Sequence, residues 1–270
     1  PTRHQELDNR RASAQAVLPS AVSVISLAVN YYHPEDPAPQ ETAGKVAKYA
    51  YGRDYHTVIG KKLKKLAVFI REAGGPGTEV KSYVGTGPIL EKAFAREAGL
   101  GFFGKDTNII TREFGSWVFL ASLLTNRELD YDTAHAGACG SCRLCIDACP
   151  TDALLGDYRM DATKCISYLT IESKEEHPPA LKEKMGDWIF GCDICQDVCP
   201  YNRRAKTTVH KEFYEEKRAG TWIHPEKIDQ LASDDEFRTM FQGSPLKRPK
   251  RAGLGRNART VAENRRATQV

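Results

Sequence analysis

The sequence of 270 residues has no apolar run long enough to cross a bilayer, since runs such as VSVISLAV and SWVFLASLL are far too short. No leader with a charged start, an apolar centre and a small-residue cleavage site opens the chain, which begins at Pro1 rather than Met. There is also no G-x-G-x-x-G after a strand and no G-x-x-x-x-G-K-[ST] loop, so nothing marks a flavin, nicotinamide or nucleoside triphosphate site. We therefore expect a soluble, cytoplasmic protein that does not contact a membrane.

The chain has little excess charge overall, with a formal net charge of +4, but that charge is unevenly distributed. Between Lys247 and Arg266, eight basic residues accompany one acid, Glu263. Such a stretch could bind an anionic partner through phosphate contacts. It could equally be a solvated C-terminal helix.

Cysteine is scarce, with eight in the chain, yet four stand close together in GACGSCRLCIDACPTDA (137–153). Their spacing, C-x2-C-x2-C-x3-C-P, is typical of bacterial two-cluster ferredoxins. A zinc site would need one or two C-x2-C pairs with a long gap, and it has no use for the x3-C-P ending. In those ferredoxins the fourth cysteine binds the other cluster, so a partner motif should exist.

The partner motif is IFGCDICQDVCPYN, in which Ile189 stands where a complete copy would have a fourth cysteine. Cys165, in ATKCISYLTIE, completes the count. The spacing therefore predicts two [4Fe–4S] clusters, with a pair of structural zinc sites as the alternative. The exchange rule assigns the cysteines as Cys139, Cys142, Cys145 and Cys199 to one cluster and Cys149, Cys165, Cys192 and Cys195 to the other.

The segment before the cysteines alternates between strand and helix patterns. A β-branched run at 17–32 predicts a strand, and helical spacing of apolar residues within 45–75 predicts a helix that Gly74 and Gly75 end. A short strand at 78–84, a helix within 87–101 and a hairpin at 107–126 follow. This order indicates an α/β layer with a mixed sheet, to which the cluster module is appended.

Six segments together resemble the epoxyqueuosine reductase family, which is related in fold to the reductive dehalogenases. They are KYAYGRDYH (48–56), GPILEKAFAREAGLGFFGKDTNII (87–110), FGSWVFLASLLTN (114–126), CGSCRLCIDACPTDAL, CISYLTIE and GCDICQDVCPYN. The resemblance covers nearly all of residues 10–257. It implies an enzyme with cobalamin and two [4Fe–4S] clusters that reduces epoxyqueuosine to queuosine in the anticodon loop of tRNA. It further implies a monomer that receives electrons from an external one-electron donor such as flavodoxin or ferredoxin.

The fold that the resemblance implies is α+β. A nitroreductase-like α/β cobalamin-binding domain at 1–134 would be followed by a ferredoxin-like module with two [4Fe–4S] clusters at 135–205. Residues 206–270 would form a C-terminal helical segment with a basic tail.

The resemblance also implies a catalytic site with one departure. The family has a proton-donating Asp in a V-D-[ST]-G-P stretch, whereas YVGTGPILEK places Gly85 there. The loss of a positioned general acid commonly costs about 10²–10⁴ in rate. Asp54 and Tyr55 match the family's site and could, with His56, replace it, although Asp54 could instead cap a helix. Asp106 is a further possible acid.

Cobalamin should bind without a protein histidine on cobalt, because D-x-H-x-x-G is absent. By resemblance, seven polar residues could contact corrin amides, and each could equally be an ordinary turn or sheet residue. They are Lys48, Tyr49, Thr111, Ser116, Ser167, Tyr168 and Thr170.

Resemblance also gives the basic stretch a partner, since Lys247, Arg248, Lys250 and Arg251 could hold tRNA phosphates. Trp188 and Trp222 could stack on a splayed base or belong to the core.

Two alternatives remain at this stage. A reductive dehalogenase-like cobalamin enzyme would act on a small molecule and would not bind tRNA. A ferredoxin-type electron carrier would bind iron and sulfide but no corrin.

Overall fold

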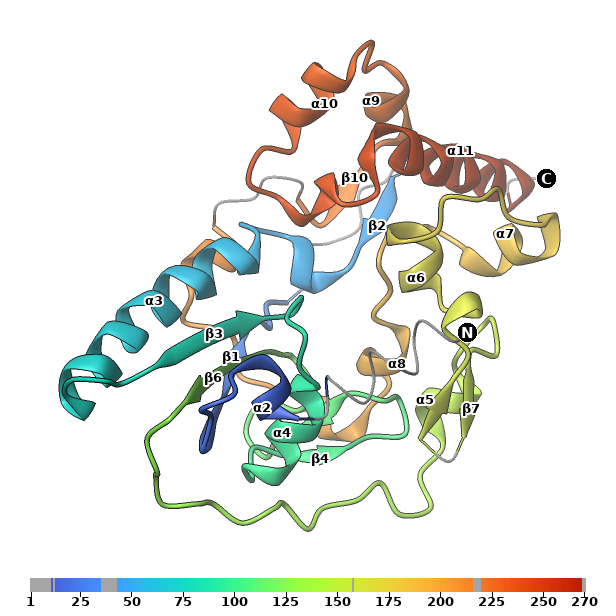
Figure 1. Cartoon of the computed structure of the whole chain (residues 1–270). Helices are drawn as coiled ribbons and strands as arrows, with labels where there is room; N and C mark the ends of the chain where they lie inside the picture. Colours follow the sequence, from blue (N-terminus) through green and yellow to red (C-terminus); the bar gives the residue numbers. More distant parts are fainter. Residues whose placement is uncertain (1–10, 12, 35–42, 157, 216–219, 269–270) are drawn as a thin grey trace.

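The computed structural model describes residues 11, 13–34, 43–156, 158–215 and 220–268 (Figure 1). The elements of its N-terminal half are α2 (Ala14–Val17), β1 (Ser23–Asn30), β2 (Gly44–Val46), η1 (Lys48–Ala50), α3 (Tyr55–Gly74), β3 (Val80–Val84), α4 (Glu91–Glu97), β4 (Phe102–Phe103), β5 (Ile109–Ile110) and β6 (Val118–Thr125). The remaining elements are α5 (Leu144–Asp147), β7 (Leu154–Gly156), β8 (Arg159–Met160), η2 (Ala162–Lys164), α6 (Ile166–Ile171), α7 (Pro179–Met185), β9 (Trp188–Phe190), α8 (Ile194–Asp197), η3 (Pro200–Asn202), η4 (Lys211–Phe213), β10 (Trp222–Ile223), α9 (Pro225–Asp229), α10 (Asp234–Met240), η5 (Pro245–Lys247) and α11 (Lys250–Thr268). The fold is a mixture of helices and strands, as the sequence predicted.

The main sheet has the strand order β1-β6-β3, and both of its pairings are antiparallel. The expectation of a mixed sheet is wrong here. The strand–helix–strand unit β1-α3-β3 is present, but β6 lies between its two strands and runs opposite to both. A strand–helix–strand pattern predicts parallel neighbours only if no later strand enters between them. The central strand β6 is the most buried of the three, and α3 packs against the sheet (Figure 1).

The hairpin expected at 107–126 forms only in part. Its first strand, β5, pairs with β4 rather than with β6, and a single bridge between Thr111 and Gly115 joins the two sides of the turn. Gly115 has a φ of +57°, which favours glycine at this tight turn. The two strands were correctly located, but they belong to different sheets.

Helix α3 confirms the helix that the spacing of apolar residues within 45–75 predicted. Asp54 caps its N-terminus, and Gly75, with a φ of +73°, ends it. Val58 and Leu63 face the core, whereas Phe69 is 64% exposed on the outer side. Among the described residues, no helix combines the length and the apolar character that a membrane span requires.

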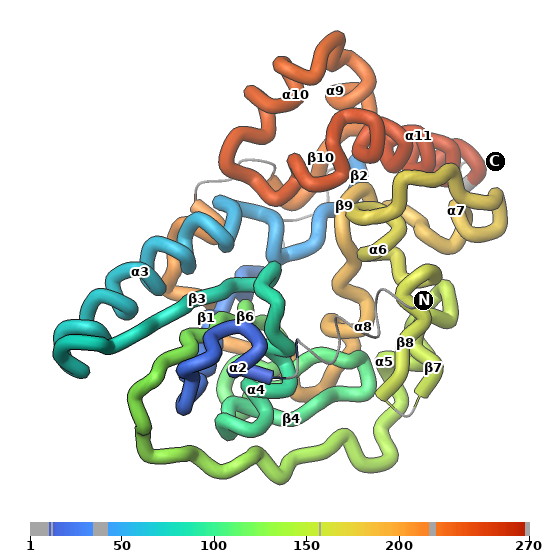
Figure 2. Tube along the Cα trace, viewed as in Figure 1, coloured from blue at the N-terminus to red at the C-terminus, as the bar shows by residue number. Residues whose placement is uncertain are grey.

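A second sheet, with the order β10-β2-β9, takes one strand from each of three distant parts of the chain (Figure 2). Its β2–β9 pairing is parallel and its β10–β2 pairing is antiparallel. Across this sheet the Lys45 ammonium lies over the rings of both Trp188, at 4.9 Å, and Trp222, at 5.7 Å. Trp188 is buried and is therefore not free for a base, whereas Trp222 is partly buried with the Lys45 ammonium over its ring.

Helix α11 joins this second sheet through buried polar side chains. The Asn257 side-chain amide donates to the carbonyl oxygens of Thr170 (2.7 Å) and Ile189 (3.0 Å). The Arg256 guanidinium donates to the carbonyl oxygen of Leu169 at 2.7 Å, among others. Part of the basic stretch is therefore structural, because these donors satisfy buried main-chain acceptors.

Candidate active site and metal centres

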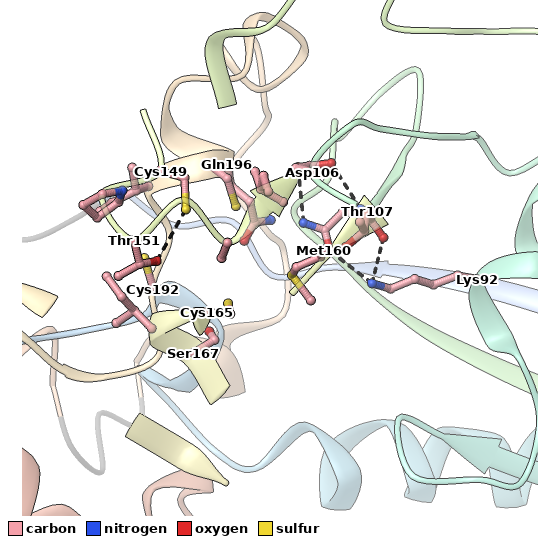
Figure 3. Close-up of a pocket in the computed structure, with 17 residues that line it drawn as sticks. Lys92, Asp106, Thr107, Cys149, Thr151, Met160, Cys165, Ser167, Cys192 and Gln196 are labelled. Carbon is pink, nitrogen blue, oxygen red and sulfur yellow. Dashed lines mark hydrogen bonds between the residues drawn. The ribbon is translucent and has the colours of Figure 1, made fainter. Parts of the chain in front are cut away.

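Two cavities each bring together four of the eight cysteines. The first cysteine cavity lies between α5 and η3, and the second, of about 220 Å³, opens beside α6 and α8 (Figure 3). The first is lined by Cys139, Cys142, Cys145 and Cys199, and the second by Cys149, Cys165, Cys192 and Cys195. These are the two sets that the sequence spacing predicted. In the described residues, no three His, Cys, Asp or Glu side chains converge as ligands of one metal ion would.

The two cysteine runs fold alike, which explains why each sends its last cysteine to the other cavity. A single short helix follows Cys142 in the first run (α5) and Cys192 in the second (α8), and these helices pack against each other. The N–H of Cys149 then donates to the Ile146 carbonyl at 3.2 Å, as the N–H of Cys199 does to that of Gln196. The proline after each of these cysteines prevents the helix from continuing. The chain therefore turns, and the last sulfur of each run lines a different cavity from the other cysteines of that run.

Burial in these cavities disfavours free thiolates. It raises the pKa of Cys145 to about 11 and raises that of Cys195 well above its usual value. Neighbouring negative groups, Asp106 among them, raise both further. A cationic iron cluster would reverse this balance, since metal binding releases the thiol protons. Eight sulfurs in two sets of four are the donors that [4Fe–4S] clusters require.

Asp106 lines both cysteine cavities, so it lies between the two sets. Burial raises the pKa of its carboxyl group, while the main-chain and side-chain N–H groups of Asn108 donate to it at 3.1 and 3.2 Å. Gly85 lines neither of these two cavities. The position of Asp106 is therefore better suited to influencing the clusters than to replacing the acid missing at Gly85.

Two further cavities extend the second cysteine cavity into a row. The middle cavity, of about 220 Å³, shares Lys92 and Asn108 with the second cysteine cavity. The outer cavity, of about 590 Å³, shares Tyr55 and Gly85 with the middle one. The three cavities are thus neighbours in a row, from the second cysteine set, past the candidate catalytic residues, to the basic residues of the outer cavity.

Gly85, Tyr55 and Glu91 line the middle cavity of this row and form its centre. Gly85 adopts a φ of +68°, and its N–H donates to the two carboxylate oxygens of Glu91 at 2.9 and 3.1 Å. The Tyr55 ring stacks on Phe119, with ring centroids 4.2 Å apart, and burial raises the pKa of its hydroxyl to about 12. A Cβ on residue 85 would lie 2.6 Å from Tyr55 Oη. The glycine therefore leaves room for the tyrosine hydroxyl.

Sequence reasoning missed Glu91. As an acid in the first turn of α4 it has the usual signature of a residue that stabilises a helix N-terminus, which conceals any other role. Its distinguishing features, its partial burial and its contact with Gly85, come from the tertiary structure.

Asp54 lies beside this centre but acts as the N-cap of α3. Its carboxylate accepts from the main-chain N–H of His56 at 2.9 Å and lies 2.8 Å from the ring nitrogen Nδ1 of the same residue. Burial tends to raise the pKa of Asp54, but these hydrogen bonds outweigh it and hold the pKa below its usual value. A carboxyl group that is ionised at neutral pH has no proton to give, so the capping interpretation fits better.

Of the seven candidate corrin contacts, three line the row of cavities. Tyr49 lines the outer cavity, Ser116 the middle one and Ser167 the second cysteine cavity. Tyr168 is exposed on α6 and does not line these cavities of the described chain.

Two of the remaining candidates use their hydroxyl groups within the fold. That of Thr111 donates to the Gly115 carbonyl oxygen at 3.0 Å. That of Thr170 donates to the Ile166 carbonyl oxygen at 2.8 Å and accepts from the N–H of Gly191 at 2.9 Å. Both side chains are buried, so they stabilise a turn and a helix rather than face the row of cavities.

Lys48 also lies apart from these cavities, because its side chain is only 5% exposed. Its ammonium group lies 2.8 Å from Asp197 Oδ1, 3.7 Å from Asp193 Oδ2 and 4.9 Å from the centre of the Trp117 ring. Burial raises the pKa of Asp193 to about 6 even though Lys48 lowers it. Lys48 therefore compensates buried negative charge.

The basic residues divide between the outer cavity and internal ion pairs. Lys247, Arg248 and Lys250 line the outer cavity, opposite Tyr55. Arg248 is bonded to Glu172 through two contacts of 3.0 and 3.2 Å, whereas Arg251 pairs with Asp234 on α10. Three basic residues therefore line the outer cavity, together with the acids Asp54 and Glu172.

Comparison with known proteins places this arrangement in a family. The family model described as "Epoxyqueuosine reductase QueG, DUF1730" matches residues 11–86, and a 4Fe-4S double cluster binding domain matches residues 138–202. The epoxyqueuosine reductase of Gloeobacter violaceus is 45% identical over 259 residues, which cover 94% of this chain and 80% of that protein. The chain belongs to the epoxyqueuosine reductase family. The Synechocystis enzyme of the same name is 43% identical over 255 residues, or 92% of this chain and 86% of its own length.

Solved epoxyqueuosine reductases share the fold. One, in complex with an epoxyqueuosine-modified tRNA-Tyr stem loop, has a TM-score of 0.88 and 32% identity over 95% of this chain and 68% of its own. Another, from Bacillus subtilis, has a catalytic aspartate loop swung out of its active site, with a TM-score of 0.85, 30% identity and the same coverage.

Restoring an aspartate at Gly85 should destabilise this member of the epoxyqueuosine reductase family. The positive φ alone costs a non-glycine residue about 1–2 kcal/mol, and the new Cβ must also displace Tyr55 from its stack on Phe119. The cost should fall in a Tyr55→Phe background, because the hydroxyl at 2.6 Å is gone. Thermal midpoints of the four proteins measure this coupling.

Gly77→Asp is the matched control, since Gly77 has a φ of +78° and no atom lies within 4 Å of the position that a Cβ would take there. It should carry the backbone cost alone. If Gly85→Asp costs no more than Gly77→Asp, and Tyr55→Phe adds independently, the close contact with Tyr55 does not constrain residue 85.

Proposed function

We propose that this chain reduces the epoxide of epoxyqueuosine to the alkene of queuosine in the anticodon loop of tRNA, with two [4Fe–4S] clusters and cobalamin as cofactors. It would act as a monomer in the cytoplasm and take electrons from an external carrier such as flavodoxin or ferredoxin. Membership of the family supports the reaction. The observation that carries the proposal is the row of cavities, which connects the second cysteine set to Tyr55, Gly85 and the basic residues.

The chain's own residues suggest how the cofactors would be held. The first cysteine cavity would hold one cluster and the second cysteine cavity the other, each with four thiolates. The middle and outer cavities offer aromatic walls, from Tyr49, Tyr55 and Phe119, and the Ser116 side chain for a flat corrin. When bound, these groups would supply single electrons to the epoxide carbon.

Proton donation and tRNA binding would be carried out by protein side chains. The epoxide oxygen must receive protons before it leaves as water, so an acid has to stand in the same cavity as the substrate. Lys247 and Lys250, at the outer cavity, would contact phosphates of the anticodon loop, with binding that weakens as salt rises. The nucleoside would enter the cavity from this side, while the rest of the tRNA would stay outside.

An anaerobic turnover assay tests the proposal. The chain is reconstituted with iron, sulfide and cobalamin, supplied with a one-electron reductant, and incubated with tRNA that carries epoxyqueuosine. Mass spectrometry of the digested tRNA should show queuosine formed in a time-dependent manner. Protein reconstituted without cobalamin is the control and should form none.

Two other results would contradict the proposal. Protein that holds both clusters but binds no corrin would be a ferredoxin-type carrier. Protein that binds all cofactors, leaves the tRNA unchanged and reduces a halogenated aromatic compound would be a small-molecule enzyme.

A further inference from the structure

The proposed function, on which this inference rests, leaves one chemical role without a residue. The site needs a proton donor, and Gly85 stands where the family's aspartate is expected. The ionised Asp54 cannot serve, and Asp106 belongs to the cysteine cavities. The carboxyl of Glu172 is paired with Arg248. Among the described carboxyl groups of the middle and outer cavities, Glu91 remains.

Glu91 occupies the space next to the missing side chain. It starts α4, six residues after Gly85, and both of its carboxylate oxygens lie within 3.1 Å of the Gly85 main-chain nitrogen. It lines the middle cavity together with Gly85 and Tyr55. The carboxyl group is thus delivered from the helix to the main-chain nitrogen of Gly85, in the cavity that Gly85 and Tyr55 also line.

The surroundings of Glu91 favour retention of its proton. The side chain is partly buried, and the buried Tyr55 beside it offers no positive charge. The hydrogen bond from the Gly85 N–H, and after it the nearby His56 and Arg11, lower its pKa only in part. Lys92, its neighbour in sequence, turns away to donate to the Thr107 carbonyl oxygen at 2.9 Å. Burial dominates and raises the pKa of Glu91 to about 7. An acid is most effective when its pKa lies near the working pH.

We infer that Glu91 is the proton donor of this site and that it replaces the aspartate absent at Gly85. As the C–O bond of the epoxide opens, the oxygen keeps the bonding pair and takes the Glu91 proton to form a hydroxyl group. The carbon receives its electrons from the external one-electron donor through the proposed cofactors. The Glu91 carboxylate then regains a proton from water and gives it to the hydroxyl group as the second C–O bond breaks. Water leaves, and the electron pair that the first carbon received becomes the second bond of the alkene.

Kinetics of the reconstituted enzyme provide the first test. Turnover of epoxyqueuosine-tRNA by the wild type should fall as the pH rises through about 7, because the carboxyl group loses its proton. Glu91→Gln should lower turnover about 10²–10⁴-fold and abolish that pH limb, and Glu91→Asp should retain part of both. Glu97→Gln, the same change on the exposed face of α4, should behave as the wild type.

A second readout needs no turnover. Val84–Gly85 is the only Val-Gly pair in the sequence, so labelling valine carbonyl carbon with ¹³C and glycine with ¹⁵N isolates the Gly85 amide in a carbonyl-amide correlation NMR spectrum. Since this N–H donates to Glu91, its chemical shift should titrate with a midpoint near 7 in the cluster-loaded wild type and stay flat in Glu91→Gln. The same spectrum shows whether the variant is folded.

The outcomes separate this inference from the proposed function. If the wild type forms queuosine and Glu91→Gln matches its rate and pH profile, or if the Gly85 amide titrates near the ordinary value of about 4.3 for a glutamate, the inference on Glu91 is wrong and the function stands. If fully loaded wild type leaves the tRNA unchanged, the function fails and the role of Glu91 fails with it.

Discussion

Replacing Cys149 by serine should remove about half of the iron from the reconstituted protein and leave the cluster of the first cysteine cavity in place. Each [4Fe–4S] cluster needs four thiolates, and Cys149 lines the second cysteine cavity although it belongs to the first sequence run. Serine is a much poorer ligand for iron at neutral pH because its hydroxyl group does not ionise there. Iron and sulfide analysis measures the loss, and electron paramagnetic resonance of the reduced protein should show one cluster instead of two.

Paired substitutions decide which cluster is lost. Cys149→Ser combined with Cys192→Ser should lose no more iron than either alone, because both residues line one cavity. Combined with Cys142→Ser, which affects the first cysteine cavity, it should lose nearly all. The opposite pattern would mean that each sequence run binds its own cluster, against the exchange of the fourth cysteine.

Replacing Lys48 by methionine should lower the free energy of unfolding by about 3–5 kcal/mol, because Asp193, 2% exposed, loses the main positive charge that compensates it. For a chain of this size that loss corresponds to a thermal midpoint about 10 °C lower. Lys64→Met, an exposed change on α3, is the matched control and should have little effect.

A companion variant separates this structural role from a corrin contact. Adding Asp193→Asn to Lys48→Met should restore part of the stability, because the buried charge is then removed with its partner. A lysine that contacted the corrin would give a different result: an unchanged midpoint for the cofactor-free protein together with weaker cobalamin binding.

The features behind these predictions differ in how far apart the contacting residues lie in the sequence. The cysteine runs carry their geometry locally, since two or three residues between cysteines and a following proline dictate where each sulfur can point. For the same reason the extent of α3 could be predicted, with its apolar spacing, its aspartate cap and the glycine that ends it. Where the contacts that define a structure lie within a few residues of one another, the sequence is nearly sufficient to predict that structure.

The candidate site was less predictable because its polar residues look alike in sequence. Thr170 and Ser116 are both short hydroxyl side chains in segments that resemble the family, yet one bonds main-chain groups of its own helix and of Gly191 while the other also lines a cavity. No local pattern distinguishes them, because the difference lies in neighbours more than twenty residues away or in the shape of a cavity. The strand order β1-β6-β3 was missed for the same reason.

The sequence by itself determined the two cysteine sets and the alternation of helix and strand, since each is a property of residue type and spacing, whereas the expectation of an acid at Gly85 came from the family resemblance. Only the tertiary structure decided that Lys48 is an internal counter-ion and that Glu91 stands beside Gly85, where burial raises its pKa to about 7. The physical reason is that desolvation and charge compensation depend on everything packed around a group, and folding brings those neighbours from distant parts of the chain.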